Sequence, residues 1–250
     1  MKYNSVTEIL NDTAVGKISL IGNPDSILMP MWAINHYITE LCNNYNKITT
    51  IRKICQLAQS GVTPEQVYIH ESSAKIFLDK PIKELYKFNM NTFINLSSKL
   101  QMFPAPYERT KIPAFWCKLS RLKRPLVFIK QGDDFIPLID VNYYDSIKIT
   151  SLAYNSPIQI DLQGGLSGLK DLFYAGKRFD METAEHIAKQ IGQGTDNIGK
   201  IASAGQVVED ERTPSWIKKY AQNELEFLLH KQHELNKMLG MRVKKIDKLT

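Results

Sequence analysis

The feature that most constrains the fold is a periodic apolar seam near the C-terminus, within residues 213–241. Its members recur at alternating steps of three and four residues or at their sum, and Gln232 occupies the remaining seam position. The apolar members are Ala221, Leu225, Leu228, Leu235 and Leu239. This spacing aligns the side chains along one face of an α-helix. It predicts one long amphipathic helix whose apolar face needs a partner surface.

Both ends of this helix carry terminal signals. Thr213 followed by Pro214 is typical of a helix start, because threonine is a favourable N-cap and proline suits the first helical position. Gly240 is typical of a helix end, because glycine readily adopts the backbone conformation that terminates a helix. The sequence therefore bounds the helix closely.

We predict that this helix binds a protein partner or a second copy of the chain. Large aromatic side chains often dominate such interfaces, and the helix carries three of them beside its leucine seam. The predicted partner-binding residues are Trp216, Tyr220, Leu225, Phe227, Leu228, Leu235 and Leu239. The alternative is that the helix folds back onto its own domain, since about three short heptads do not distinguish the two arrangements. Binding of a partner or of a second copy through this helix predicts a noncatalytic scaffold or adaptor.

The remaining patterns predict an α+β fold in three regions. Residues 1–103 form a mainly helical N-terminal part, residues 104–163 a mostly antiparallel β part, and residues 164–250 a C-terminal helical region. In the first region, helical spacing of apolar residues predicts separate helices over 32–41 and 48–58 and a third over 81–102.

Five short strands are predicted in the central region. They cover residues 115–122, 125–130, 135–141, 147–154 and 158–162, with a hairpin turn at 132–134. Because no helix separates them, an antiparallel arrangement is expected. Alternation of apolar and polar residues in 158–162 predicts a strand with one face exposed to water.

Basic residues give a competing functional interpretation. The chain has a formal net charge of +6, and residues 109–130 contain seven Lys and Arg side chains but no Asp or Glu. Basic residues interleaved with aromatic ones suit contacts with phosphates and stacked bases, although a solvated sheet face has the same composition. The candidate nucleic-acid-binding residues are Trp116, Lys118, Arg121, Lys123, Arg124 and Lys130.

Motifs for catalysis and for cofactor binding are incomplete. Residues 194–200 have the spacing of a phosphate-binding loop, but Ile201 follows where Ser or Thr would bind magnesium. His230 and His233 lie three residues apart on the long helix without a full set of metal ligands in view. No Gly-x-Ser-x-Gly motif is present. We predict no catalytic residue, no cofactor site and no metal site.

Composition and cysteine usage predict a folded cytoplasmic protein. Hydrophobic residues make up 43% of the chain and aromatic residues 10%, which is enough for a packed core. The three cysteines are an odd number and have no Cys-x-x-Cys spacing, so a disulfide framework is not expected. No apolar run approaches the roughly 20 residues needed to span a bilayer. The N-terminus lacks the pattern of a signal peptide.

Overall fold

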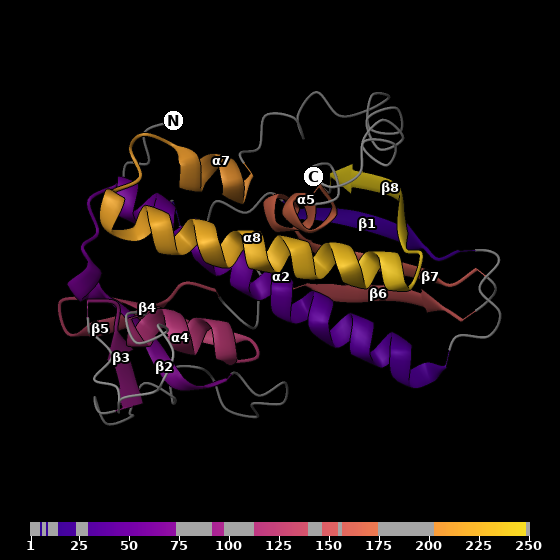
Figure 1. The fold of residues 1–250 in the computed structure, drawn as a ribbon, viewed down its shortest axis with the longest axis horizontal. Helices are drawn as coiled ribbons and strands as arrows, with labels where there is room; N and C mark the ends of the chain where they lie inside the picture. Colours follow the sequence, from indigo (N-terminus) through magenta and orange to yellow (C-terminus); the bar gives the residue numbers. More distant parts are fainter. Residues whose placement is uncertain are drawn as a thin grey trace, which may run out of the picture.

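The computed structural model describes residues 15–23, 30–73, 92–97, 113–139, 147–154, 157–174 and 203–248, together with Val6 and Ile9. Within these residues, helices combine with two four-stranded sheets in which all paired strands are antiparallel. The predicted α+β class is therefore confirmed. Figure 1 shows a pair of long helices, α2 and α8, between the larger sheet and the smaller one.

The larger sheet has the strand order β6-β7-β1-β8. Its strands are β1 (Val15–Ile21), β6 (Lys148–Ala153), β7 (Gln159–Gly165) and β8 (Arg242–Lys248). Ile18 lies opposite Leu162, and these two side chains are buried on the face that carries the helices. The strands predicted at 147–154 and 158–162 are confirmed, as is the alternation in the second. Strands from all three sequence regions meet in this sheet.

The smaller sheet has the order β3-β2-β4-β5. It contains β2 (Val67–Ser73), β3 (Phe93–Asn95), β4 (Pro125–Gln131) and β5 (Asp134–Pro137), and a short 3-10 helix, η1 (Pro64–Gln66), leads into β2. Gly132 joins β4 to β5 with a φ of +60°, a conformation that favours glycine. This geometry confirms the hairpin turn predicted at 132–134.

One continuous helix, α2 (Met31–Gln59), replaces the two predicted over 32–41 and 48–58. The prediction of two helices was wrong because the polar stretch between them resembles a break. In the structure that stretch faces polar groups of α8: the Asn44 side chain donates a hydrogen bond to Gln232. The helix ends where the sequence predicted, since Gly61 follows with a φ of +100°.

Two further predictions were wrong. Residues 115–122 were expected to be a strand, but α4 (Ala114–Arg121) is a helix that buries Phe115, Trp116 and Leu119. A short apolar run fits either structure, and here the spacing of the buried residues is helical. Within the helix predicted over 81–102, the described residues 92–97 contain β3, which pairs with β2. Residues 81–91 and 98–102 of that prediction lie outside the described residues.

The C-terminal helices are α5 (Leu166–Tyr174), α7 (Ala204–Glu209) and α8 (Ser215–Met238). The long helix and its end at Gly240 are confirmed; Gly240 has a φ of +58°. Thr213 is not the N-cap, because Pro214 occupies that position. The Thr213 hydroxyl instead donates a hydrogen bond to the Val207 carbonyl at 2.7 Å. Thr213 therefore ties α8 to α7.

Candidate partner-binding surface on helix α8

The apolar seam of α8 packs inside its own chain. Leu225, Leu228, Leu235 and the flanking Leu239 are buried in the core, together with Ala221. The seam faces α2, which runs antiparallel to α8: Gln59 at the end of α2 contacts Thr213, and Tyr37 near its start contacts Asn236. The periodicity predicted a partner surface for the seam, and α2 of the same chain provides one (Figure 1).

A chain of amide hydrogen bonds explains the polar residue in the seam. The Asn44 Nδ2 donates to Gln232 Oε1 at 3.0 Å, and Gln232 Nε2 donates to Asn236 Oδ1 at 2.8 Å. The Tyr37 hydroxyl donates to the same Asn236 oxygen at 2.9 Å. Buried polar networks favour one alignment of two helices, because any shift leaves a polar group without its partner. The network therefore fixes the register of α8 on α2.

Charged groups continue this contact toward the surface. Lys231 of α8 forms an ion pair with Glu40 of α2, and Glu40 also accepts a hydrogen bond from Asn43. Burial alone would raise the pKa of Glu40, but the hydrogen bond and charge of Lys231 hold it below its usual value. At Glu224, burial is the dominant effect and the pKa is raised. Burial also lowers the pKa of Lys47. The pKa values of the two carboxyl groups therefore differ because the hydrogen bond and charge of Lys231 outweigh burial at Glu40, whereas burial outweighs the charge of Lys47 at Glu224.

A second apolar stripe of α8 faces away from the seam. Trp216, Tyr220 and Phe227 are four and seven residues apart, so they lie along one side of the helix. Trp216 and Tyr220 are half-buried against the core, whereas Phe227 is 58% exposed. Met238 continues the stripe at the end of the helix and is 59% exposed. We call these four residues the outer stripe.

Helix α4 covers only the first part of the outer stripe. The indole ring of Trp116 stacks on the Tyr220 ring, and Trp116 itself is buried. Lys47 reaches the same junction from α2 and donates a hydrogen bond to the Ser120 carbonyl. Beyond this junction, Phe227 and Met238 remain exposed. The seven predicted partner-binding residues therefore divide into a buried seam and a partly open outer stripe.

The candidate nucleic-acid-binding residues differ in exposure, and their aromatic member, Trp116, is buried. Arg121 and Lys123 are exposed near the end of α4, and Lys118 and Arg124 are partly buried. Lys130 lies on β4. Trp116 points instead to Tyr220, so its ring is covered by another aromatic side chain of the chain. The structure thus joins one residue of each predicted site, Trp116 and Tyr220, and buries the Trp116 ring while Arg121 and Lys123 are exposed.

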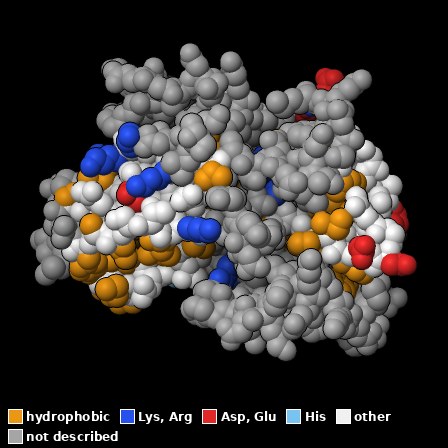
Figure 2. All heavy atoms as spheres, turned by 180° about the vertical axis from the view of Figure 1, so that it is seen from behind, with side chains coloured by type: hydrophobic (Ala, Val, Ile, Leu, Met, Phe, Trp, Pro, Cys, Tyr) orange, Lys and Arg blue, Asp and Glu red, His pale blue; other side chains and the backbone are white. Residues whose placement is uncertain are grey.

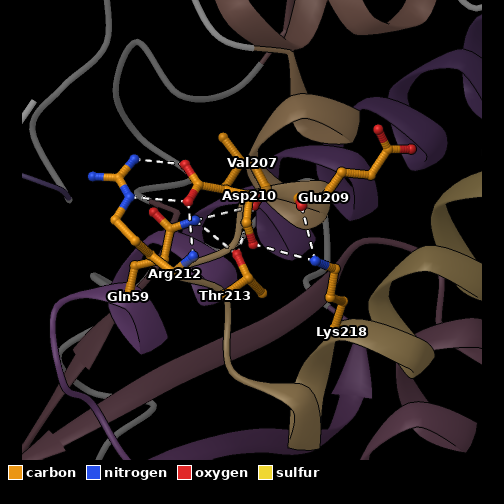
Figure 3. A network of polar contacts seen from close by, with 7 residues as sticks. All are labelled: Gln59, Val207, Glu209, Asp210, Arg212, Thr213 and Lys218. Carbon is orange, nitrogen blue, oxygen red and sulfur yellow. Dashed lines mark hydrogen bonds and ion pairs between the residues drawn. The ribbon is translucent and has the colours of Figure 1, made fainter.

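The α7–α8 corner fixes where α8 begins (Figure 3). Gln59 Nε2 donates to Thr213 Oγ1 at 2.7 Å and to the Val207 carbonyl at 3.0 Å. Lys218 Nζ donates to the Glu209 carbonyl at 2.8 Å, which satisfies the end of α7. These bonds hold three helices in one arrangement and so determine where the outer stripe lies.

An ion pair lies on the exposed side of the α7–α8 corner. The Arg212 side chain donates to both carboxylate oxygens of Asp210, at 2.9 and 2.6 Å. These bonds and the Arg212 backbone amide lower the pKa of Asp210 to about 2. The pair is exposed, so we assign it a role in shaping the turn and not a large share of stability.

Sequence reasoning missed a group of buried polar residues where α2, α5 and α7 meet. Asp171 of α5 accepts a hydrogen bond from the Ala204 backbone amide at 2.9 Å. Burial raises the pKa of Asp171 to about 7, although the Ala204 bond and the charge of Arg52 oppose this change. Its second oxygen and the Arg52 Nε have no hydrogen-bond partner among the described residues. No sequence pattern marks this group, because its members come from distant segments.

Other chemical candidates receive no geometric support from the described part of the chain. Among those residues, no group of three His, Cys, Asp or Glu side chains is arranged to hold a metal ion. The loop-like segment at 194–200 lies outside the described residues. None of the described helices combines the length and apolar character needed to cross a membrane. No protein-family model, no curated protein and no solved structure matches this chain.

Proposed function

We propose that the protein is a noncatalytic adaptor that docks an amphipathic helix of a protein partner on the open part of the outer stripe. One observation carries this proposal: Phe227 is 58% exposed on the same stripe whose first half receives an aromatic side chain of α4. The partner would bind beside α4 and continue the layer that α4 begins. The seam of α8 stays packed on α2 throughout.

The physical basis is the cost of leaving a phenyl ring in water. Full burial of a Phe side chain contributes about 1.5–3 kcal/mol, and tenfold in affinity corresponds to about 1.4 kcal/mol. Lys231, one turn from Phe227, forms an ion pair with Glu40 and so supplies charged groups beside the ring. An apolar anchor beside polar side chains is the usual anatomy of a protein interface. Phe227 is therefore the residue whose loss should weaken docking most.

A photo-crosslinking experiment in cells tests this proposal and captures the partner in the same step. Benzoylphenylalanine replaces Phe227 in one variant and Gln222 in a control, since Gln222 is exposed on another side of the same helix. We expect a discrete crosslinked protein from position 227 and not from position 222. We also expect the purified partner to bind the Phe227→Glu variant at least about tenfold more weakly than it binds the wild type. Equal crosslinking at both positions would contradict docking on the outer stripe.

A second proposal is that the protein binds nucleic acid. It rests on the exposed Arg121 and Lys123, which lie in the segment 109–130 that contains no acidic residue. Positive charge of this kind supplies mainly salt-dependent, nonspecific affinity. Fluorescence anisotropy of a labelled single-stranded oligonucleotide at two salt concentrations tests it. If the proposal is right, replacing Arg121, Lys123 and Arg124 with Glu abolishes the salt-sensitive binding; binding that survives this change would refute it.

We further propose a cytoplasmic location. This proposal rests on the three unpaired cysteines, Cys42, Cys55 and Cys117. Burial raises the pKa of the Cys55 thiol to about 12 and that of Cys42 to about 11, so both are poor thiolates. Small buried thiols suit a reducing compartment. Imaging of a fluorescently tagged chain tests the location directly.

A further inference from the structure

The two edges of the larger sheet differ sharply in charge. Strand β8 contains Arg242, Lys244 and Lys245. Each edge strand has one irregularity in its pairing, which lies between Ser19 and Leu20 of β1 for β8 and between Ile149 and Ser151 for β6. Strand β6 has one charged residue, Lys148, at its first position. Five of the six residues of β6 are exposed. The sheet therefore has one highly charged edge and one nearly uncharged edge.

Charged side chains are a usual protection of a sheet edge against pairing with another strand, and they distinguish β8 from β6. Very short edge strands serve the same purpose, and in the smaller sheet β3 has three residues and β5 has four. Among the described strands, β6 is the edge that combines length with low charge. An edge of this kind is suited to pairing, because its outer N–H and C=O groups have no described strand beside them.

Apolar side chains accompany this edge. Ile149 lies opposite Leu162 and Leu152 lies opposite Ile160, so both point to the helical face of the sheet, yet they are 43% and 44% exposed. Figure 2 shows a row of hydrophobic side chains at the lower left of the molecule and several Lys and Arg side chains above it. The buried side chains of β7 therefore continue into an uncovered apolar row on β6.

We infer that a second copy of the chain pairs with this edge, β6 against β6 in antiparallel orientation, and joins two larger sheets into one of eight strands. In any register centred within residues 150–152, a twofold axis places Ile149 and Leu152 of both copies on the same face. The two Lys148 side chains then lie at opposite ends of the interface, about 14–27 Å apart along the strands at about 3.4 Å per residue. This distance exceeds the Debye length of about 8 Å at physiological ionic strength, so the two charges do not oppose pairing.

The charge pattern selects this occupant and orientation. A parallel arrangement in register would place Lys148 beside its own copy, which is unfavourable. Pairing through β8 would bring together two strands that each carry several cations. The antiparallel β6 pairing avoids both conflicts and is independent of the outer stripe of α8, since it uses a different surface.

Light scattering of the full chain over a range of concentrations tests the dimer. We expect a mass approaching twice 28.6 kDa for the wild type. Leu152→Lys should raise the dimer dissociation constant at least about tenfold, because it adds a charge to the edge. Gln159→Lys is the matched control, because it adds the same charge at an exposed position of β7, which is already paired on both sides. A monomeric wild type at about 100 μM would overturn the inference.

A disulfide test is independent of the stability of the Lys variant. Ser151 lies near the proposed twofold axis, and directly opposed residues of antiparallel strands have Cα atoms about 4.5–5.5 Å apart, within the range of a disulfide. Ser151→Cys should therefore form a covalent dimer on oxidation, whereas the wild type with its three native cysteines should not. One result would assign self-association to α8 and refute the β6 pairing. In that result, Phe227→Glu breaks the dimer, Leu152→Lys leaves it intact, and Ser151→Cys does not crosslink it.

Discussion

Trp116 of α4 and Tyr220 of α8 stack with their ring centroids 6.0 Å apart and their planes inclined by 19°. Trp116 is only 4% exposed, so this contact belongs to the core and not to an open base-stacking platform. It joins the short helix that precedes β4 of the smaller sheet to the long C-terminal helix. The stacking therefore links the two parts of the chain to which the sequence assigned separate functions.

The first prediction concerns this stacked pair. Trp116→Ala should lower the free energy of unfolding by about 3–5 kcal/mol, because it removes a large buried side chain. Tyr220→Ala should cost less, since Tyr220 is only partly buried. In a double-mutant cycle measured by urea unfolding, the two changes should couple by about 0.5–1.5 kcal/mol. Coupling near zero would show that the stacked geometry adds nothing beyond burial.

The second prediction concerns Gln232, which is fully buried in the apolar seam. Gln232→Leu should destabilise the protein by about 1–3 kcal/mol, because Asn44 then loses the acceptor of its side-chain hydrogen bond. Replacing both residues by Leu should recover part of this loss, since no polar group is stranded in that pair. Urea unfolding of the wild type and the two variants measures both values. A Gln232→Leu variant that is as stable as the wild type would contradict the proposed role of the network.

The third prediction concerns Gly168, where α5 crosses α2. A Cβ atom at this position would lie 2.6 Å from Tyr45 Cε2 and 2.7 Å from Thr49 Oγ1. Tyr45 cannot move freely, because its hydroxyl accepts a hydrogen bond from the Gly165 amide at 2.7 Å. Gly168→Ala gains about 1 kcal/mol in helix propensity but should lose more than this through overpacking.

Thermal unfolding measures the balance at Gly168. We expect a net loss of about 1–2 kcal/mol in the free energy of unfolding. Gly164→Ala is a graded comparison, because its nearest contact, with the Tyr45 hydroxyl, would be 3.1 Å. It should therefore cost less than Gly168→Ala. If Gly168→Ala were the more stable of the two variants, the close crossing would not limit this position.

The parts of the fold that the sequence predicted well are long or strongly alternating. The α8 seam and the β7 alternation both extend over enough residues for their period to be recognised. Residues 115–122 were misassigned because eight residues of mixed character fit a helix or a strand. At Phe93–Asn95, pairing with β2 decides the structure, and that partner lies far away in the sequence.

The candidate site was less accessible to sequence reasoning. Periodicity showed that Leu225 and Leu228 needed a partner surface, but which chain supplies it depends on contacts with distant residues. The outer stripe was present in the sequence as three aromatic residues, yet only the position of α4 determines that Phe227 is the exposed one. The low charge of β6 was visible, whereas its place at a sheet edge was not.

The last prediction concerns the buried Asp171 and its effect on stability at different pH values. Three elements face this carboxyl group: Arg52 comes from α2, Lys170 from α5, and the Ala204 amide from α7. Burial dominates over all three and raises the pKa of Asp171 from 3.8 to about 7. Asp171→Asn is a suitable comparison, because an amide oxygen can still accept the bond from Ala204 but the group no longer titrates.

Because the folded pKa of Asp171 is above the unfolded one, the folded state binds the proton more tightly between about pH 4 and pH 7. The contribution of Asp171 to stability is therefore fully present below pH 4 and is lost as the pH rises toward and beyond 7. At 1.36 kcal/mol per pKa unit, the loss is on the order of 4 kcal/mol. We expect the free energy of unfolding of the wild type, minus that of Asp171→Asn, to fall by this order across the interval in urea titrations. A difference that stays flat or rises with pH would show that Asp171 is ionised in the folded protein throughout, with Arg52 and Lys170 outweighing its burial.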